Sequence, residues 1–391
     1  MECLYRINCG DEKGNFTDRL GRVWLADQTL SPGREWGAIG GHGVHRDEAI
    51  PPSDDVAPEL YRTERYAMKG YEFALPDATY EVKLHFAETF ESHYRIGFRA
   101  FDVRINGFRL LHEFDPYSAA GGFAKPVVKT FANVGAPDGR LSIELSEGAM
   151  INAIEIFRVS STPAPRRTRK RILFVGNSHC IFWAMTLSVE RFVNTTPGDI
   201  YLEVHRSLLG GRDMGHHYDQ TDAAKKIIDG KYEYVVVQSI PIKDPNMKAR
   251  FETYAPKYAE LARFAGSELL LYCTWPHKGD PLSRFDDISV PHLEVCRRLE
   301  IRFVPAGPAW KEALTRRPDL QLFNVSDDIH SGLWGAYLTC CVFYGVLTEK
   351  SPVGVVPATV IEGQVNVDPE TARFLQDVAW DTVSKYRTAE R

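Results

Sequence analysis

Three side chains in the second half of the chain have the chemistry of a nucleophile and its base. The apolar run 172–175 leads directly into the sequence Gly-Asn-Ser-His, in which Ser178 is the third residue. Asp327 precedes His330 by three residues, so one short segment can supply a general base and the carboxylate that orients it. A serine in this position is, by itself, more often a helix cap. Together the three residues predict nucleophilic acyl chemistry.

The segments around these side chains predict an α/β unit that would hold them together. Apolar runs alternate with segments of helical length, which is typical of a parallel sheet covered on both faces. Ser178 then lies at the carboxyl edge of the sheet, where open α/β sheets bind ligands. Asp327 and His330 lie on a loop before the last helix. The predicted strands are residues 172–175, 234–237, 269–272 and 301–304.

The sequence Val-Gly-Asn-Ser ending at Ser178 resembles the first block of the SGNH/GDSL hydrolases, and Asp327 with His330 is similar to their Asp-x-x-His block. The resemblance covers residues 172 to about 350. It implies a flavodoxin-like three-layer α/β sandwich in which Ser178 is the nucleophile, His330 the base and Asp327 the group that orients it. It also implies chemistry without a metal or another cofactor.

Ester cleavage needs hydrogen-bond donors for the oxyanion. The resemblance implies the backbone N–H groups of Ser178 and Gly211, with Gly210 as a substitute for Gly211. The family's third donor is an asparagine in a Gly-x-Asn-Asp block, and this chain departs from that pattern, because its strand ends in Val-Gln-Ser. Gln238 is our candidate donor, and a structural role for it stays open. Without it, about 3 kcal/mol of stabilisation would be missing.

Other polar and aromatic residues fall on the loops expected at this sheet edge. His179, His216 and His217 are expected to line the cleft without binding a metal, because no carboxylate or cysteine stands at a suitable spacing beside them. Asp213 and Trp275 could shape substrate choice. Trp275 could stack on a sugar ring, or it could pack in the core.

The sharpest change in composition lies at residues 161–171, which are polar and basic and contain two prolines. This pattern predicts a linker. The alternative, a nucleic-acid patch, would normally include aromatic residues, and this segment has none. We therefore expect two domains, residues 1–160 and 172–350, followed by a helical tail, residues 351–391, packed on the second domain.

The first 160 residues predict an all-β sandwich, because short runs of alternating apolar and polar residues are separated by turn signals. Several segments resemble malectin-type carbohydrate-binding modules, which implies a malectin-like jelly roll. The segments that carry this resemblance are residues 5–10, 60–66, 84–88 and 101–107.

The malectin resemblance implies sugar contacts in the first domain. Aromatic faces suit the apolar C–H edges of pyranose rings, and amides suit their hydroxyl groups. By position in the matching segments, Trp36, Tyr61 and Phe90 are the candidate stacking residues, and Asn152 is the candidate polar contact. The competing role for this domain is packing against the second one.

Composition narrows the classes of partner. A formal net charge of -5 and a pI near 6.2 provide no basic field for nucleic acid or an anionic membrane. No segment has the apolar length of a bilayer span, and no charged and then apolar leader begins the chain. We expect a cytoplasmic protein as the sequence is written, or a secreted one if a leader has been removed. The oligomeric state is left open.

The two resemblances together imply a carbohydrate esterase that removes acetyl groups from a glycan or oligosaccharide. Two alternatives stay open. One is a glycan-binding or scaffolding protein whose hydrolase domain is catalytically weak. The other is an esterase for lipids or thioesters, which would need a long apolar groove for the acyl chain.

Overall fold

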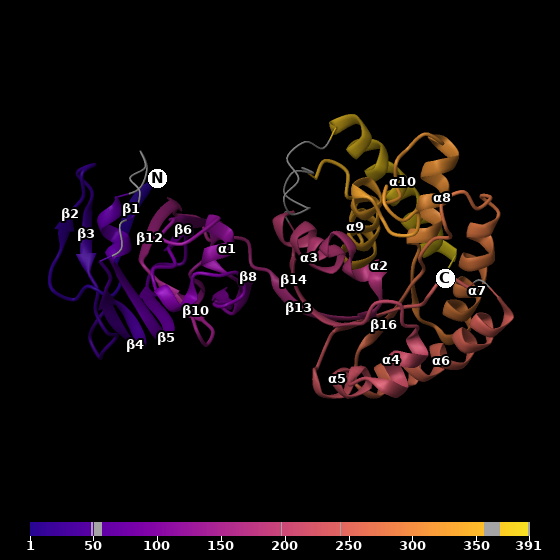
Figure 1. The fold of residues 1–391 in the computed structure, drawn as a ribbon, viewed down its shortest axis with the longest axis horizontal. Coiled ribbons are helices and arrows are strands. Elements are labelled where there is room, and N and C mark those ends of the chain that lie inside the picture. The colour runs from indigo at the N-terminus through magenta and orange to yellow at the C-terminus, as the bar shows by residue number, and fades with distance from the viewer. Residues whose placement is uncertain (48–49, 51–56, 197, 243, 356–367, 390–391) are drawn as a thin grey trace. The chain divides into compact units, whose positions relative to one another are not determined.

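The computed structural model divides the chain into two compact units, Met1–Arg166 and Arg167–Arg391. Each unit has its own hydrophobic core, and Figure 1 shows the elements of each. No helix within the described residues has the length and apolarity needed to cross a membrane. The structure describes residues 1–47, 50, 57–196, 198–242, 244–355 and 368–389.

The N-terminal unit is a sandwich of two sheets whose strands pair antiparallel, apart from one parallel pair between β1 and β3. The first sheet has the order β2 (Phe16–Thr17), β3 (Val23–Ala26), β1 (Glu2–Asn8), β12 (Ala153–Ser160), β6 (Thr79–Phe86) and β9 (Val127–Val134). The second has the order β11 (Met150–Ile151), β5 (Thr63–Ala74), β10 (Arg140–Leu145), β7 (Phe101–Ile105) and β8 (Phe108–Phe114), and β4 (Trp36–His45) also pairs with β5. Short helical segments are α1 (Pro116–Ala120), η1 (Pro58–Arg62), η2 (Glu91–His93) and η3 (Pro137–Gly139).

Alternation along the strands builds the core between these sheets. In β10, Leu141, Ile143 and Leu145 are buried, whereas the residues between them are partly or fully exposed. Gly70 allows β5 to approach β10 closely, since a Cβ there would lie 1.8 Å from the Ile143 carbonyl oxygen. The predicted all-β sandwich is confirmed for this unit.

The C-terminal unit contains a five-stranded parallel sheet, as predicted. Its order is β14 (Ile200–Leu208), β13 (Thr168–Gly176), β15 (Tyr234–Gln238), β16 (Glu268–Tyr272) and β17 (Arg302–Val304). Strand β14 was not predicted from the sequence, because it is an edge strand in which Glu203, His205 and Arg206 interrupt the apolar pattern. The order changes direction between β13 and β15, and a ligand crevice forms at such a switch point.

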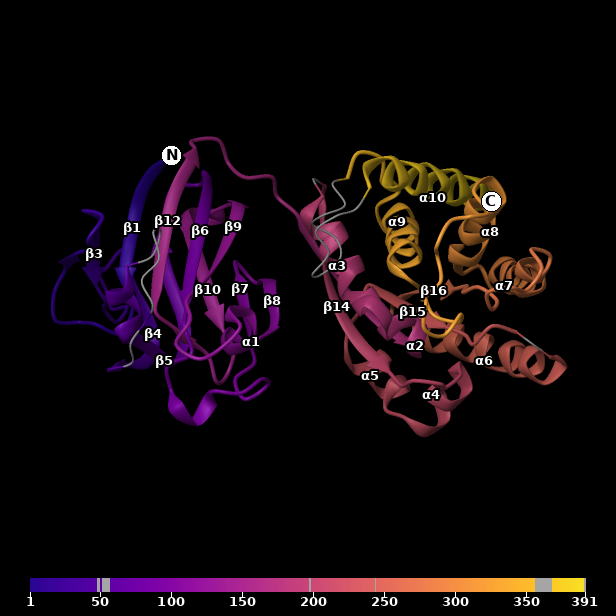
Figure 2. The ribbon, with the colours of Figure 1, turned by 45° about the horizontal axis from the view of Figure 1, so that its top comes forward.

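Helices cover both faces of this sheet (Figure 2). Ile172 and Phe174 of β13 pack on the side of α3 (Met185–Thr195), α8 (Ala306–Arg316), α9 (Leu333–Thr348) and α10 (Pro369–Ala389). Leu173 and Val175 face α4 (Met214–Gln220), α5 (Ala223–Asp229), α6 (Pro245–Phe264) and α7 (Arg284–Leu299). The short α2 (Ser178–Ile181) and η4 (Phe182–Ala184) follow β13 directly.

The connection between the units is shorter than the predicted linker, residues 161–171. Strand β13 begins at Thr168, and residues 168–171 pair with β14, whereas pairing with β15 starts only at Ile172. This first half of β13 can carry the basic residues because they are exposed or only partly buried. The basic residues at 169–171 therefore belong to the start of strand β13 and not to the end of the linker.

The predicted helical tail, residues 351–391, contains α10. Helix α9 is buried almost throughout, and α10 packs against it through Leu375, Val378 and Val383. An all-apolar helix such as α9 needs a covering layer on its outer side. Residues 356–367 and 390–391 of the tail lie outside the described residues.

Leu375→Ala tests whether α10 is part of the second core. Leu375 is fully buried, so truncation should lower the free energy of unfolding of the C-terminal unit by about 2–5 kcal/mol. The measurement is urea unfolding followed by tryptophan fluorescence, with the exposed Arg373→Ala as the control on the same helix. Equal stability of the two variants would contradict this packing.

Candidate active site

Ser178 lies on a tight turn between β13 and α2. The strand ends at Gly176, where a Cβ would come within 2.7 Å of the Cys180 sulfur atom, so this position requires glycine. Asn177 caps α2, because its side-chain oxygen accepts a hydrogen bond from the His179 N–H at 3.1 Å. The turn presents a partly buried Ser178 at the carboxyl edge of the sheet.

The structure brings Ser178, His330 and Asp327 into one hydrogen-bonded chain. The Nε2 atom of His330 lies 2.7 Å from the Ser178 Oγ, and its Nδ1 lies 2.8 Å from the Asp327 Oδ2. The other carboxylate oxygen of Asp327 accepts the backbone N–H groups of Ile329 and His330, at 3.0 and 2.9 Å. His330 is therefore in direct contact with both of the other predicted residues, Ser178 and Asp327.

These contacts decide which nitrogen of His330 carries the proton. Desolvation acts to raise the pKa of Asp327, but the hydrogen bonds from the His330 and Ile329 backbone and from the His330 ring outweigh it and lower this pKa to about 2. An ionised carboxylate only accepts, so Nδ1 must donate to it. Nε2 is then free to accept the proton of the Ser178 hydroxyl.

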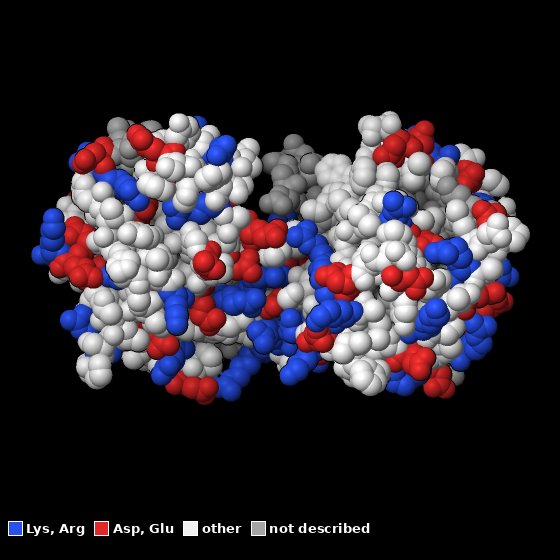
Figure 3. All heavy atoms as spheres, turned by 60° about the horizontal axis from the view of Figure 1, so that its bottom comes forward, with Lys and Arg blue, Asp and Glu red and all other residues white. Residues whose placement is uncertain are grey.

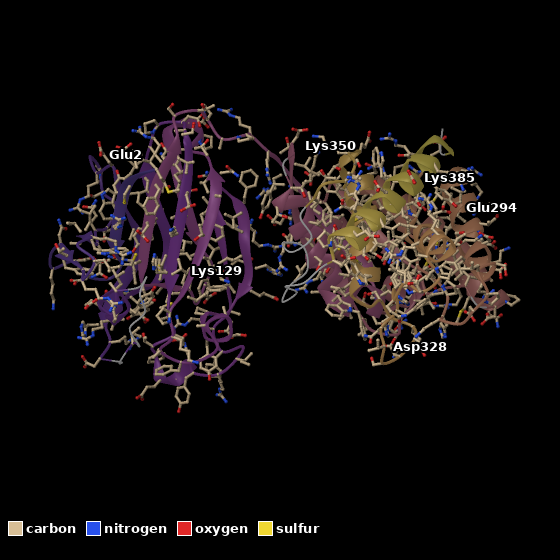
Figure 4. The ribbon with its side chains drawn as sticks, turned by 90° about the horizontal axis from the view of Figure 1, so that it is seen from above. Glu2, Lys129, Glu294, Asp328, Lys350 and Lys385 are labelled. Atoms are coloured by element: carbon tan, nitrogen blue, oxygen red, sulfur yellow. The ribbon has the colours of Figure 1, made fainter. Side chains whose placement is uncertain are left out.

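Contacts from a second loop hold the segment that carries Asp327 and His330. The indole N–H of Trp275 donates to the Ile329 carbonyl oxygen at 3.0 Å, and the Lys278 N–H donates to the Asp328 carbonyl oxygen at 2.9 Å. Asp328, labelled in Figure 4, has a positive φ of 53° and makes a salt bridge of 3.2 Å with Lys278. Trp275 and Lys278 therefore anchor the loop that carries Asp327 and His330.

Phe182 is a site residue that the sequence analysis missed. Its ring lies flat on the His330 imidazole, with 3.8 Å between ring centroids and 1° between planes. Trp183 and Ala184 follow with φ angles of 55° and 44°, so the chain bends sharply to place Phe182 there. An aromatic residue four positions after the serine was the only available signal in the sequence.

The loop with Gly211 lies beside the Ser178 turn. The Leu209 N–H donates to the Gly176 carbonyl oxygen at 3.0 Å, and the Asn177 side chain donates to the Arg212 carbonyl oxygen at 3.1 Å. Gly211 is exposed and has a φ of 69°, in the left-handed region that favours glycine. Gly210 is also exposed. The backbone of this loop is therefore accessible next to the serine.

Gln238 does not supply the donor that we expected. Its side chain is fully buried, and its carbonyl oxygen accepts the Asn177 N–H at 2.9 Å, while its amide nitrogen donates to the Ser239 carbonyl oxygen. Both ends of the amide are engaged beneath the serine turn. The geometry supports the alternative, in which the Gln238 side chain forms hydrogen bonds with backbone groups of the loops.

Two of the aromatic residues proposed to stack on sugar belong to the core of the N-terminal unit. Trp36 is 9% exposed and stacks on Phe73 at 6.2 Å. Tyr61 is fully buried, and its hydroxyl group lies 2.9 Å from the His85 Nδ1. Neither ring offers a face to a ligand, so both assignments are wrong.

Asn152 and Trp275 are also buried. The Asn152 side chain accepts the Ala87 N–H at 2.7 Å and donates to the Thr63 carbonyl oxygen at 2.8 Å, so it satisfies loop backbone and is not a sugar contact. Trp275 is 1% exposed and stacks on Trp310 at 3.7 Å, which corresponds to the core-packing alternative.

Exposed aromatic side chains of the N-terminal unit gather in the segment 90–98 instead. Phe90, one of our candidates, is partly exposed, and the Arg46 guanidinium lies 4.8 Å above its ring. Tyr94 and Phe98 are 58% and 47% exposed. The sequence analysis missed the last two, because burial decides which aromatic faces are available.

The three histidines near the serine differ in their surroundings. His179 is buried and packs edge-on against Trp275 at 5.1 Å. His216 is partly exposed, whereas His217 is buried and lines a cavity of about 520 Å³. Across the part of the chain that the structure describes, no three His, Cys, Asp or Glu side chains are grouped as a metal site.

Comparison with known families identifies the first unit. The family model for the malectin domain matches residues 3–164. The N-terminal unit is a malectin domain. A probable LRR receptor-like serine/threonine-protein kinase of Arabidopsis thaliana is 30% identical to this chain over 148 residues, which are 32% of this chain and 14% of the kinase. The chain thus spans only a small part of this relative.

Two solved structures are similar over a longer part of the chain. Protein YXIM of Bacillus subtilis is 14% identical and has a TM-score of 0.44, with 88% of this chain and 98% of that protein covered. A DUF4886 family protein of Bacteroides uniformis is 15% identical and has a TM-score of 0.45, with 56% of this chain and 95% of that protein covered.

The low pKa of Asp327 predicts a specific pH dependence. An unfolded aspartate titrates near pH 3.9, so the ionised native carboxylate stabilises the folded state above about pH 4, and this contribution is lost as the pH falls from about 4 to 2. A ¹³C NMR titration of the side-chain carboxyl groups, with Asp327→Asn to assign the signal, should give a midpoint near pH 2. A midpoint near 4 would show that the hydrogen bonds are not maintained in solution.

Proposed function

We propose that this chain is a serine-dependent carbohydrate esterase of the SGNH/GDSL type, which removes O-acetyl groups from a glycan or oligosaccharide. The observation that carries the proposal is the contact of 2.7 Å between the Ser178 Oγ and a His330 Nε2 whose other nitrogen donates to a carboxylate. This arrangement activates a hydroxyl group as a nucleophile. The N-terminal malectin domain favours sugar as the alcohol part of the ester.

The proposed reaction proceeds through an acyl-enzyme. The Ser178 oxygen attacks the acetyl carbonyl carbon while its proton moves to the His330 Nε2. The tetrahedral intermediate then expels the sugar oxygen, which takes that proton from His330. Water repeats the sequence on the acetyl-serine and releases acetate. Asp327 stabilises the imidazolium that forms in each step.

The oxyanion would be stabilised by the backbone N–H groups of Ser178 and Gly211. Phe182 would keep the imidazole in its plane and cover one of its faces. A base held in this way stays aligned with the Ser178 hydroxyl between the two acyl-transfer steps. Phe182 is therefore a positioning residue in this proposal.

A second candidate function is a glycan-binding protein with a catalytically weak hydrolase domain. The burial of Gln238 favours it, because this amide is engaged beneath the turn and cannot reach an oxyanion. The loss of one such donor typically costs roughly 3 kcal/mol of transition-state stabilisation, or 10²–10³ in kcat. The intact chain of Ser178, His330 and Asp327 favours the esterase.

Ser178→Ala tests the reaction class and the nucleophile together. Wild type should release acetate from acetylated xylan, acetylated pectin or small acetylated sugars. The variant should lose at least 10³-fold in kcat while its circular dichroism spectrum stays that of the wild type, since triad knockouts remove most of the rate enhancement. Equal turnover by the variant and the wild type would disprove the role of Ser178.

A serine-reactive phosphonate separates the two candidate functions. It should label Ser178 in the wild type, and mass spectrometry should place the adduct on that residue. No labelling, together with no release of acetate from glycans or short aryl esters, would favour the glycan-binding protein.

The malectin domain is proposed to bind the same polymer through the exposed segment 90–98. Tyr94→Ala combined with Phe98→Ala should weaken retention of the full chain on an affinity gel that contains acetylated xylan, because stacking faces are lost. The control is Val23→Ala, which also removes an exposed apolar side chain from this domain. Equal retention of both proteins would argue that the domain does not bind this glycan through these rings.

A further inference from the structure

A cavity of about 340 Å³ opens next to Gly211, between the loop that follows β14 and the residues that follow β15. Its volume is near the lower end of the range for small-molecule sites. Polar side chains on its wall come from the loop before α4, from α4 itself, from the residue after β15 and from α6. These include Arg212, Asp213, His216, Ser239 and Arg250. Figure 3 shows how acidic and basic residues are interspersed on one face of the molecule.

Ser239 is one of the residues that line this wall, and its side chain is buried. It directly follows β15 and is 3% exposed. Its Oγ lies 2.8 Å from the Nε2 of His292, a fully buried residue of α7. The Nδ1 of His292 lies 2.7 Å from the Ile288 carbonyl oxygen, and its ring packs on Phe251 at 4.3 Å. The imidazole is thus held on three sides.

The partners of His292 fix the direction of the hydrogen bond to Ser239. A carbonyl oxygen only accepts, so the His292 Nδ1 must carry a proton. Burial lowers the pKa of His292 to about 4, and the ring is neutral at ordinary pH. Its Nε2 is therefore bare and accepts the Ser239 proton. The bond to His292 uses the Ser239 proton, so the lone pairs of the Ser239 oxygen are not used by it.

An ion pair forms another part of the wall. The Arg250 guanidinium donates to both carboxylate oxygens of Asp213, at 2.5 and 3.0 Å, and Asp213 also caps α4 by accepting the His216 N–H at 2.8 Å. The pKa of Asp213 lies below its usual range, and the main cause is the hydrogen bond from Arg250. Charged groups fixed in this way can bind hydroxyl groups without first reorganising. Apolar residues also line the cavity, namely Met214, Ile240, Met247 and Phe251.

Asn177 connects the wall of the cavity with Ser178 through hydrogen bonds. Asn177, which precedes Ser178, binds the Gln238 side chain through its N–H and the Arg212 carbonyl oxygen through its side chain. Arg212 is itself a residue of the wall, and Gln238 adjoins another, Ser239. A ligand seated there lies next to the loop that carries Gly211.

We propose that this cavity holds the sugar ring that bears the ester, and that Ser239 accepts a hydrogen bond from one of the free hydroxyl groups of that ring. His292 is the positioning residue that turns the Ser239 proton away from the cavity. This inference rests on the proposed esterase function and adds a specificity determinant to it. Polar groups for the hydroxyls and apolar groups for the C–H faces are the combination that a pyranose requires.

The test compares a sugar ester with an ester that has no hydroxyl groups on its alcohol part. For Ser239→Ala, the ratio of kcat/KM for acetylated xylan to kcat/KM for 4-nitrophenyl acetate should fall about fivefold, which is the effect of one neutral hydrogen bond. Most of the change should be in KM for xylan. The exposed Ser283→Ala is the matched control and should keep the wild-type ratio. A ratio for Ser239→Ala equal to that of the control would overturn the inference while the esterase proposal stands.

His292→Leu tests the positioning role separately. It removes the acceptor for the Ser239 proton, so the hydroxyl group can rotate and the same ratio should fall. Ser239→Thr keeps a hydroxyl group and should restore the ratio in part. If the ratio falls equally in the alanine and threonine variants, the hydroxyl is not the recognised group.

A binding measurement keeps the inference testable if no ester is cleaved. In the full chain with Ser178→Ala, calorimetric titration with acetylated xylo-oligosaccharides should detect a binding event that Ser239→Ala weakens about fivefold. With Tyr94→Ala and Phe98→Ala also present, so that the site proposed in the malectin domain does not contribute, equal heats with and without Ser239→Ala would overturn the cavity assignment. Failure of the wild type to release acetate, by contrast, would overturn only the esterase proposal.

Discussion

The Nδ1 atom of His330 must donate to a carboxylate while its Nε2 accepts from a hydroxyl group, and this double requirement constrains the rest of the C-terminal unit. The contact between Nδ1 and Asp327 is local, because the carboxylate lies three residues away and is held by two backbone N–H groups of the same loop. The contact between Nε2 and Ser178 is long-range, since Ser178 is 152 residues away in the sequence. Only the parallel sheet, with the turn after β13 at its carboxyl edge, brings the serine to this loop.

This division explains which parts of the site could be predicted from the sequence. The spacing of Asp327 and His330 is a local property. The apolar runs marked the inner strands β13, β15 and β16 and the edge strand β17, because strands buried on both faces are apolar. Phe182 could not be predicted, because its contact with His330 depends on two residues with positive φ angles that bend the chain after α2. Strand β14 was missed because an edge strand tolerates charged side chains.

The wrong predictions of ligand and oxyanion contacts share one physical cause, which is burial. Trp36 and Tyr61 have the ring faces that a sugar binds, and Gln238 has the amide that an oxyanion needs, but each is engaged inside the protein. Residue type sets what a side chain can do, whereas packing of distant segments sets what remains available. Tyr94 and Phe98 differ from the buried aromatics only in that respect.

The α/β unit contains two Ser–His pairs with similar distances and different chemistry. His330 donates from Nδ1 to a carboxylate, which can stabilise an imidazolium, so this ring can take a proton from Ser178. His292 donates from Nδ1 to a carbonyl oxygen in a fully buried site, where the charged ring is disfavoured. The same geometry therefore favours proton transfer at Ser178 and only a fixed hydroxyl direction at Ser239. The two histidines lie at similar distances from their serines, so the difference comes from the group beside each imidazole. A carboxylate favours a ring that accepts a proton, and a neutral carbonyl oxygen in a buried site favours a ring that only fixes the direction of a hydroxyl group.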